Sequence, residues 1–234
     1  MNQLPIYKIF VAGFAFVLTH WKKIIEISIL PLLLALPLLS LSAEIIELIG
    51  IFTKESTVKP ENIQVPSNVL VYSLLFLYGY ASLSVNMYRL VVFGVQSVSW
   101  MSIFKIRQIV GFIGLTFFIN LATGVPSLLV NQIWLYLVIS FFLIPISLNF
   151  INIATDQPLK FKWELNVVTQ INLFLLQIIL PLLIAIVVNF LISSLELASV
   201  ISWIVKVIIF YWSSITLALC YQLITKESQS NTSK

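Results

Sequence analysis

Long apolar runs alternate with short polar stretches along the whole sequence. Residues 27–43 and 174–192 are too long and too continuously apolar to be barrel strands, which alternate over about ten residues. Backbone polar groups in lipid must bond within their own segment, so these runs predict helices. The pattern predicts one all-α transmembrane domain, residues 1–226, with six spans at 24–43, 69–88, 108–128, 133–153, 171–192 and 207–225. We expect the short polar tail that follows, 227–234, to be disordered and cytoplasmic.

Amphiphilic segments precede the first, third and fifth predicted spans. Residues 9–18 are apolar over about 15 Å of helix, half of a bilayer core, and therefore predict a helix that lies in the inner interface. A signal anchor is the alternative for this segment. Leu159, Trp163 and Val167 share one helical face and predict a second interfacial helix. We expect three hairpins, each preceded by an interfacial amphipathic helix.

A short motif occurs twice with an offset of 150 residues. Residues 29–35 read Ile-Leu-Pro-Leu-Leu-Leu-Ala, and residues 179–185 read Ile-Leu-Pro-Leu-Leu-Ile-Ala. An internal repeat and a chance match in leucine-rich sequence both explain this similarity. The prolines Pro31, Pro37 and Pro181 predict kinks in their spans.

The composition excludes a soluble domain, because 60% of the residues are hydrophobic and only 9% are charged. The net charge of +4 is dispersed, so we expect no nucleic-acid partner. Cys220 is the single cysteine and has no partner for an internal disulfide. The chain holds one histidine and no glycine-rich phosphate loop. We therefore expect no metal, no cofactor and no enzyme activity.

The basic residues predict the orientation. If the amino terminus is cytoplasmic, the outer segments carry only Lys54, Lys59 and, if it lies at the border, Lys206. The inner segments then carry the other ten: Lys8, Lys22, Lys23, Arg89, Lys105, Arg107, Lys160, Lys162, Lys226 and Lys234. Because basic residues are enriched in cytoplasmic loops, we expect both termini to be cytoplasmic. We expect Arg89, Lys105 and Arg107, in the central connection, to contact anionic headgroups on the inner face.

Polar residues within the apolar segments are few. Lys206 lies about 15 Å deep if span 6 begins at Leu197, which would make it a functional intramembrane lysine. Residues 207–225 are long enough to cross the core alone, and residues 197–205 would then lie along the outer interface with Lys206 at the border. Asn120 in span 3 predicts an interhelical hydrogen bond or a ligand for a transported molecule. Glu26 predicts a local salt bridge with Lys22 or Lys23.

Two segments carry a resemblance to known bacterial proteins. Residues 84–94 read Ser-Val-Asn-Met-Tyr-Arg-Leu-Val-Val-Phe-Gly, and Ala154-Thr155-Asp156 precedes Trp163 and Thr169. The chain resembles uncharacterised YciC-like six-span inner-membrane proteins of proteobacteria and the membrane domain beside some glycerophosphodiester phosphodiesterases. Tyr88 stands where histidine is usual in them. The resemblance implies a bacterial inner-membrane location and no particular activity.

These patterns leave two functions open. The first is a non-catalytic integral membrane protein that organises lipids or a membrane-protein partner through its inner basic residues and interfacial helices. The second is a transporter of a small molecule or lipid, in which proline-broken helices line a pathway with Asn120, Gln177, Asn189 and Lys206 as ligands.

Overall fold

The computed structural model describes residues 4–41, 68–99, 106–130, 132–160, 163, 165–194 and 199–232. These residues form helices and no strand. The helices in chain order are α1 (Ile6–Ser40), α3 (Val69–Phe93), η2 (Val95–Ser97), α4 (Ile106–Val130), α5 (Ile133–Ser147), α6 (Asn149–Ala154), α7 (Val167–Phe174), η3 (Leu175–Ile179), α8 (Leu180–Ser194) and α9 (Ser199–Thr232).

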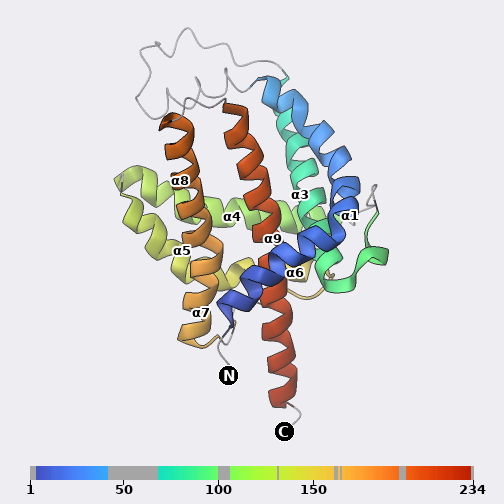
Figure 1. Cartoon of the computed structure of the whole chain (residues 1–234), viewed down its shortest axis with the longest axis vertical. Coiled ribbons are helices and arrows are strands. Elements are labelled where there is room, and N and C mark those ends of the chain that lie inside the picture. The colour runs from blue at the N-terminus through green and yellow to red at the C-terminus, as the bar shows by residue number, and fades with distance from the viewer. Residues whose placement is uncertain are drawn as a thin grey trace.

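Six segments are long and apolar enough to cross a membrane, as the sequence predicts. They are Ile6–Ser40, Val69–Phe93, Ile106–Pro126, Trp134–Ala154, Val167–Ser194 and Ile204–Lys226. Helix α1 packs against α3, α4 against α5, and α8 against α9. Helices α3, α8 and α9 run along the long axis of the molecule, whereas α4 crosses that direction (Figure 1).

Helix α1 contains a break in its helical backbone, which lies before its two prolines. The backbone leaves the helical conformation at His20 (φ −111°, ψ 17°), whereas Pro31 and Pro37 lie inside the helix with helical dihedral angles. The break separates residues 6–19 from the span and agrees with a separate first helix. This helix packs across α9, because a Cβ atom on Gly13 would lie 2.9 Å from Cγ2 of Thr216.

A π-helical stretch, η3, lies just before Pro181 and joins α7 to α8. Proline has no backbone N–H, so the carbonyl group of Gln177 loses its usual partner four residues on. Such π-turns bend helices and often occur at functional sites. The predicted irregularity near Pro181 is thus a local change of helix type.

Three predictions about helices were wrong. The interfacial helix expected at Leu159–Val167 is absent, because the described residues 155–160, 163, 165 and 166 form a turn and a loop. Residues 199–205 do not lie apart along the interface but continue into span 6 as α9. The tail is also not disordered as far as it is described, since α9 continues to Thr232.

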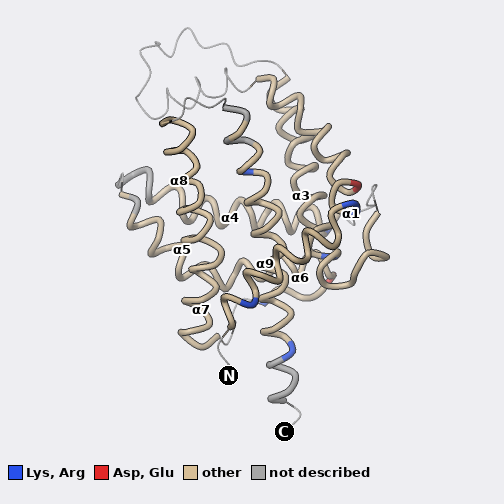
Figure 2. Tube along the Cα trace, in the orientation of Figure 1, with Lys and Arg blue, Asp and Glu red and all other residues tan. Residues whose placement is uncertain are grey.

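The tightly packed part of the bundle surrounds the later half of α3. Residues 81–88 are all buried, together with Leu148, Ile151, Ile215 and Ala218. The other ends of the spans expose large apolar side chains, including Leu33, Leu36, Leu70, Leu74, Val187 and Phe190. Such an extended apolar surface is unfavourable in water and fits lipid. Charged residues are sparse along the described spans, as Figure 2 shows.

Candidate functional site

The candidate site lies at the inner end of the bundle, which we define as the end that holds the turn at residues 155–158 and the start of α4. Asn149 in α6 binds the loop at Lys160 twice. Its Nδ2 atom donates to the Lys160 carbonyl oxygen (2.8 Å), and its Oδ1 atom accepts from the Lys160 backbone N–H (2.8 Å). The buried amide therefore fixes a loop that has no secondary structure of its own.

A second asparagine connects this loop to α9. Asn152 donates from Nδ2 to Oδ1 of Asn149 (3.0 Å), and its own Oδ1 atom accepts a hydrogen bond from the hydroxyl group of Tyr221 (2.8 Å). Asn149 and Asn152 are 3% and 1% exposed. Buried polar groups of this kind specify a packing arrangement when they are bonded. The network holds α6, α9 and the loop together.

The turn after α6 has a left-handed residue at its centre. Asp156 has a φ of 61°, a conformation that Asp and Asn adopt more readily than most side chains. The backbone N–H of Asp156 donates to Ile153 O (3.3 Å), and that of Gln157 donates to Asn152 O (2.7 Å). Two cavities adjoin this turn.

The two cavities share Gln157 and Pro158 in their walls. The larger has a volume of about 350 Å³, and its polar lining comes from Asn152, Thr155, Gln157, Lys160, Tyr221 and Thr225. The smaller, of about 290 Å³, is lined by Arg107, Gln108, Gly111, Ile153, Asp156, Gln157, Pro158 and Leu159. One basic residue therefore stands at each cavity, and one carboxylate, Asp156, also lies in the smaller.

Both basic side chains reach the surface. Arg107 and Lys160 are exposed, and the Lys160 ammonium group lies 5.2 Å from the ring centre of Trp163. This cation–π contact holds the ammonium group over the ring. The Trp163 ring also packs edge-on against Tyr221, with ring centres 6.0 Å apart. The hydrogen-bonded network that includes Tyr221 thus continues through the Trp163 ring to the charged side chain of Lys160 at the surface.

The structure separates the three basic residues of the central connection. Arg107 lines the smaller cavity, whereas Lys105 lies outside the described residues. Arg89 lines neither cavity; its carbonyl oxygen accepts from Ser97 Oγ (3.0 Å). Its buried Nε atom has no hydrogen-bond partner among the residues that the structure describes. The sequence analysis did not single out Asn149, Asn152, Lys160 or Tyr221 as members of one site.

Lys206 lies in a different part of the molecule. It borders a cavity of about 200 Å³ between α1, α3 and α9, which is otherwise lined by Pro31, Leu32, Ala35, Phe76, Gly79, Tyr80, Leu83, Val207, Phe210 and Tyr211. Pro31 and Tyr80, which line the same cavity, are near the middle of the first two predicted spans. Asn120 does not line this cavity; it is exposed and donates to Thr116 O in its own helix (2.8 Å).

Other polar side chains within the spans join helices. The Gln177 amide lies 2.9 Å from both Ser213 Oγ and Thr216 Oγ1, which connects η3 to α9.

Lys23 Nζ and Glu26 Oε1, both in α1, form the expected salt bridge at 2.7 Å. Within the part of the chain that the structure describes, no three His, Cys, Asp or Glu residues are grouped to hold a metal ion.

No protein-family model, curated protein or solved structure matches this chain.

Proposed function

We propose that this protein is a non-catalytic integral membrane protein that binds anionic lipid headgroups at its inner end and thereby organises lipids or a membrane-protein partner. The observation that carries the proposal is the pair of polar cavities around the 155–158 turn, with Arg107 at one and Lys160 at the other. Basic residues beside spans attract anionic lipids on the cytoplasmic leaflet.

The chemistry of the cavities suits a headgroup. A phosphate diester offers a negative charge and several acceptor oxygens, and the rim supplies a guanidinium and an ammonium group. The hydroxyl groups of Thr155 and Thr225 line the larger cavity. Asp156 would repel an anion within the smaller cavity, so we place the headgroup at the Lys160 side and assign Arg107 a flanking contact.

The orientation and the location belong to the same proposal. The excess of basic residues at the end that holds the 155–158 turn supports a cytoplasmic position for this end and for both termini. The resemblance to YciC-like proteins supports the inner membrane of a bacterium. Arg107 would then face the anionic leaflet, whereas Arg89, whose Nε atom is buried, lies apart from both cavities.

The test compares lipid retention by matched variants of the full chain. The protein is reconstituted in nanodiscs of phosphatidylcholine and phosphatidylglycerol, and native mass spectrometry counts the lipids that it retains. Arg107→Gln with Lys160→Gln should lose most of the retained phosphatidylglycerol. The double variant Lys22→Gln with Lys226→Gln also removes two positive charges, but from residues that do not line either cavity. It should retain phosphatidylglycerol as the wild type does. Equal retention by the two double variants would contradict the proposal.

Transport of a small molecule or lipid is the second candidate. The observation that favours it is the irregular stretch η3 beside the polar cluster of Gln177, Ser213 and Thr216, because interrupted helices line many transport pathways. Substrate flux that Gln177→Leu abolishes in proteoliposomes, while Asn120→Leu leaves it intact, would support transport through this cluster.

A further inference from the structure

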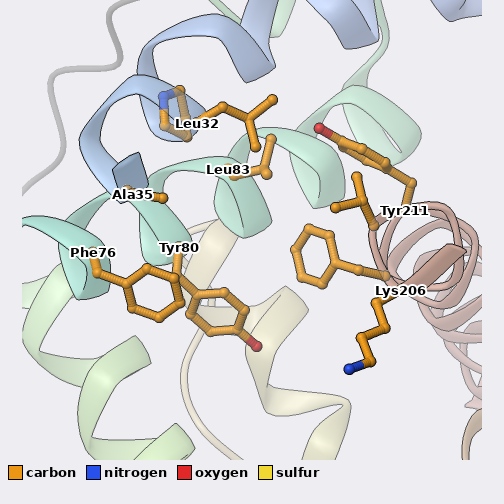
Figure 3. Close-up of a pocket in the computed structure, with 11 residues that line it drawn as sticks. Leu32, Ala35, Phe76, Tyr80, Leu83, Lys206 and Tyr211 are labelled. Carbon is orange, nitrogen blue, oxygen red and sulfur yellow. The ribbon is translucent and has the colours of Figure 1, made fainter. Parts of the chain in front are cut away.

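The cavity beside Lys206 differs in chemistry from the two inner cavities. Its wall is formed by α1, α3 and α9 and consists of aliphatic and aromatic side chains, with one charged residue, Lys206. The ammonium group of Lys206 and the hydroxyl group of Tyr80 lie on the same side of the cavity, and the hydroxyl group of Tyr211 lies on the other (Figure 3). The cavity is thus apolar, with the positive charge of Lys206 at one edge.

The shape of this cavity is fixed by close helix packing. A Cβ atom on Gly79 would lie 2.9 Å from the carbonyl oxygen of Pro31, so α3 touches the backbone of α1 beside the cavity. Tyr80 and Phe210 also line the cavity, and their ring centres are 5.6 Å apart. The volume of about 200 Å³ exceeds the roughly 150 Å³ at which an apolar cavity accommodates benzene. A segment of an alkyl chain therefore fits.

The positive charge of Lys206 indicates which polar head group a ligand of this cavity carries. A lysine within a span is expensive and is usually retained for a functional contact. The hydroxyl group of Tyr211 donates to Ser28 Oγ (2.6 Å), and Lys206 is the one charged residue in the wall. A diacyl phospholipid brings a phosphate, a glycerol and two ester groups, which is more than these groups can bond. A single carboxylate on one alkyl chain matches one ammonium group and an apolar wall.

We propose that this cavity binds a long-chain fatty acid, with its carboxylate on the Lys206 ammonium group and the first part of its chain between α1, α3 and α9. The bilayer supplies the fatty acid, and the cavity lies among the spans where the ligand partitions. This site is separate from the inner cavities and does not depend on headgroup binding there.

The experiment uses a fatty acid that labels its own binding site. The full chain in phosphatidylcholine nanodiscs is irradiated with palmitic acid that carries a diazirine in its chain and a terminal alkyne, and labelled peptides are located by mass spectrometry. We expect labels on the peptides that hold Leu32 and Phe76. Oleic acid should compete with the probe, and oleyl alcohol at the same concentration should not.

Variants then test the carboxylate contact. Lys206→Gln should lower labelling about tenfold, which is the effect of losing one charge-assisted hydrogen bond. Lys206→Arg should retain labelling, and Lys226→Gln is the matched control outside the cavity. Ala35→Phe fills the cavity and should abolish labelling even if Lys206→Gln fails to fold.

Three results would overturn the proposal. They are equal labelling of folded wild-type protein and the Ala35→Phe variant, equal competition by oleyl alcohol and oleic acid, and stronger competition by phosphatidylglycerol than by oleic acid. The last result would identify a diacyl lipid as the occupant. Because none of these readouts involves Arg107 or Lys160, failure here leaves the headgroup test unaffected.

Discussion

Tyr221 in α9 donates a 2.8 Å hydrogen bond to Asn152 in α6, across 69 residues of sequence. Asn152, which accepts this bond, is 1% exposed. This single contact joins the last span to the turn that carries both inner cavities.

The first prediction concerns this bond. Tyr221→Phe removes the hydroxyl group and leaves the buried Asn152 oxygen without its α9 donor, at a cost of about 1–3 kcal/mol. We expect a fall of at least about 3 °C in the unfolding midpoint of the protein in nanodiscs. Tyr7→Phe is the control, because Tyr7 is 78% exposed. Equal midpoints for the two variants would show that the bond does not stabilise the fold.

The second prediction concerns the contact between α1 and α3. Gly79→Ala places a methyl group 2.9 Å from the backbone oxygen of Pro31, so the helices must separate. Small residues permit such close approach in membrane helices, and overpacking costs about 1–3 kcal/mol. Heating followed by size-exclusion chromatography should show a lower midpoint for loss of the monodisperse protein.

Gly114→Ala is the matched control for Gly79→Ala. It is also a glycine within a helix, but nothing lies within 4 Å of the added Cβ atom. We expect its midpoint to equal or slightly exceed that of the wild type, because alanine favours helix. A midpoint for Gly79→Ala as high as that of Gly114→Ala would contradict close packing at Pro31.

The spans were predictable from the sequence because each one depends only on a local property. A run of about twenty apolar residues crosses a bilayer whatever it packs against. Each of the six predicted spans overlaps an apolar helix long enough to cross, and Glu26 pairs with Lys23 as its spacing indicates. The break at His20 lies between the interfacial helix predicted at 9–18 and the span predicted from residue 24, although no proline marks the position.

The inner site was not predictable in the same way. Asn149 binds the backbone of Lys160, and Asn152 binds a tyrosine from another span; neither contact leaves a periodic pattern. One signal was present: two asparagines three residues apart, on one helical face, at the end of an apolar span. The spacing of Leu159, Trp163 and Val167 resembles one face of an amphipathic helix, although the described residues 157–160 are not helical and Asn149 binds the backbone of Lys160.

The third prediction concerns the polar contact at η3. The Gln177 amide lies 2.9 Å from Ser213 Oγ. A double-mutant cycle of Gln177→Leu and Ser213→Ala, measured as free energies of unfolding, should give a favourable coupling of about 0.6 kcal/mol and at most about 1.7 kcal/mol. Gln177→Leu with Ser194→Ala is the control pair. Zero coupling between Gln177 and Ser213 would contradict an interhelical bond between them.

The fourth prediction tests the orientation in living cells. Cys220 is buried, and Cys220→Ser provides a background without cysteine. Gln132 lies in the connection between α4 and α5, and Gln157 lies in the turn at the inner end; both are exposed. In intact cells, a membrane-impermeant maleimide should label Gln132→Cys and leave Gln157→Cys unlabelled, because basic residues keep the inner end cytoplasmic.

Permeabilised cells provide the control for access, since both cysteines should react there. Labelling of Gln157→Cys in intact cells would reverse the assigned orientation and place Arg107 and Lys160 on the outer side. The headgroup proposal would then have to place both inner cavities at the outer leaflet. The fatty-acid site at Lys206 would be unaffected, since a ligand dissolved in the bilayer reaches the spans in either orientation.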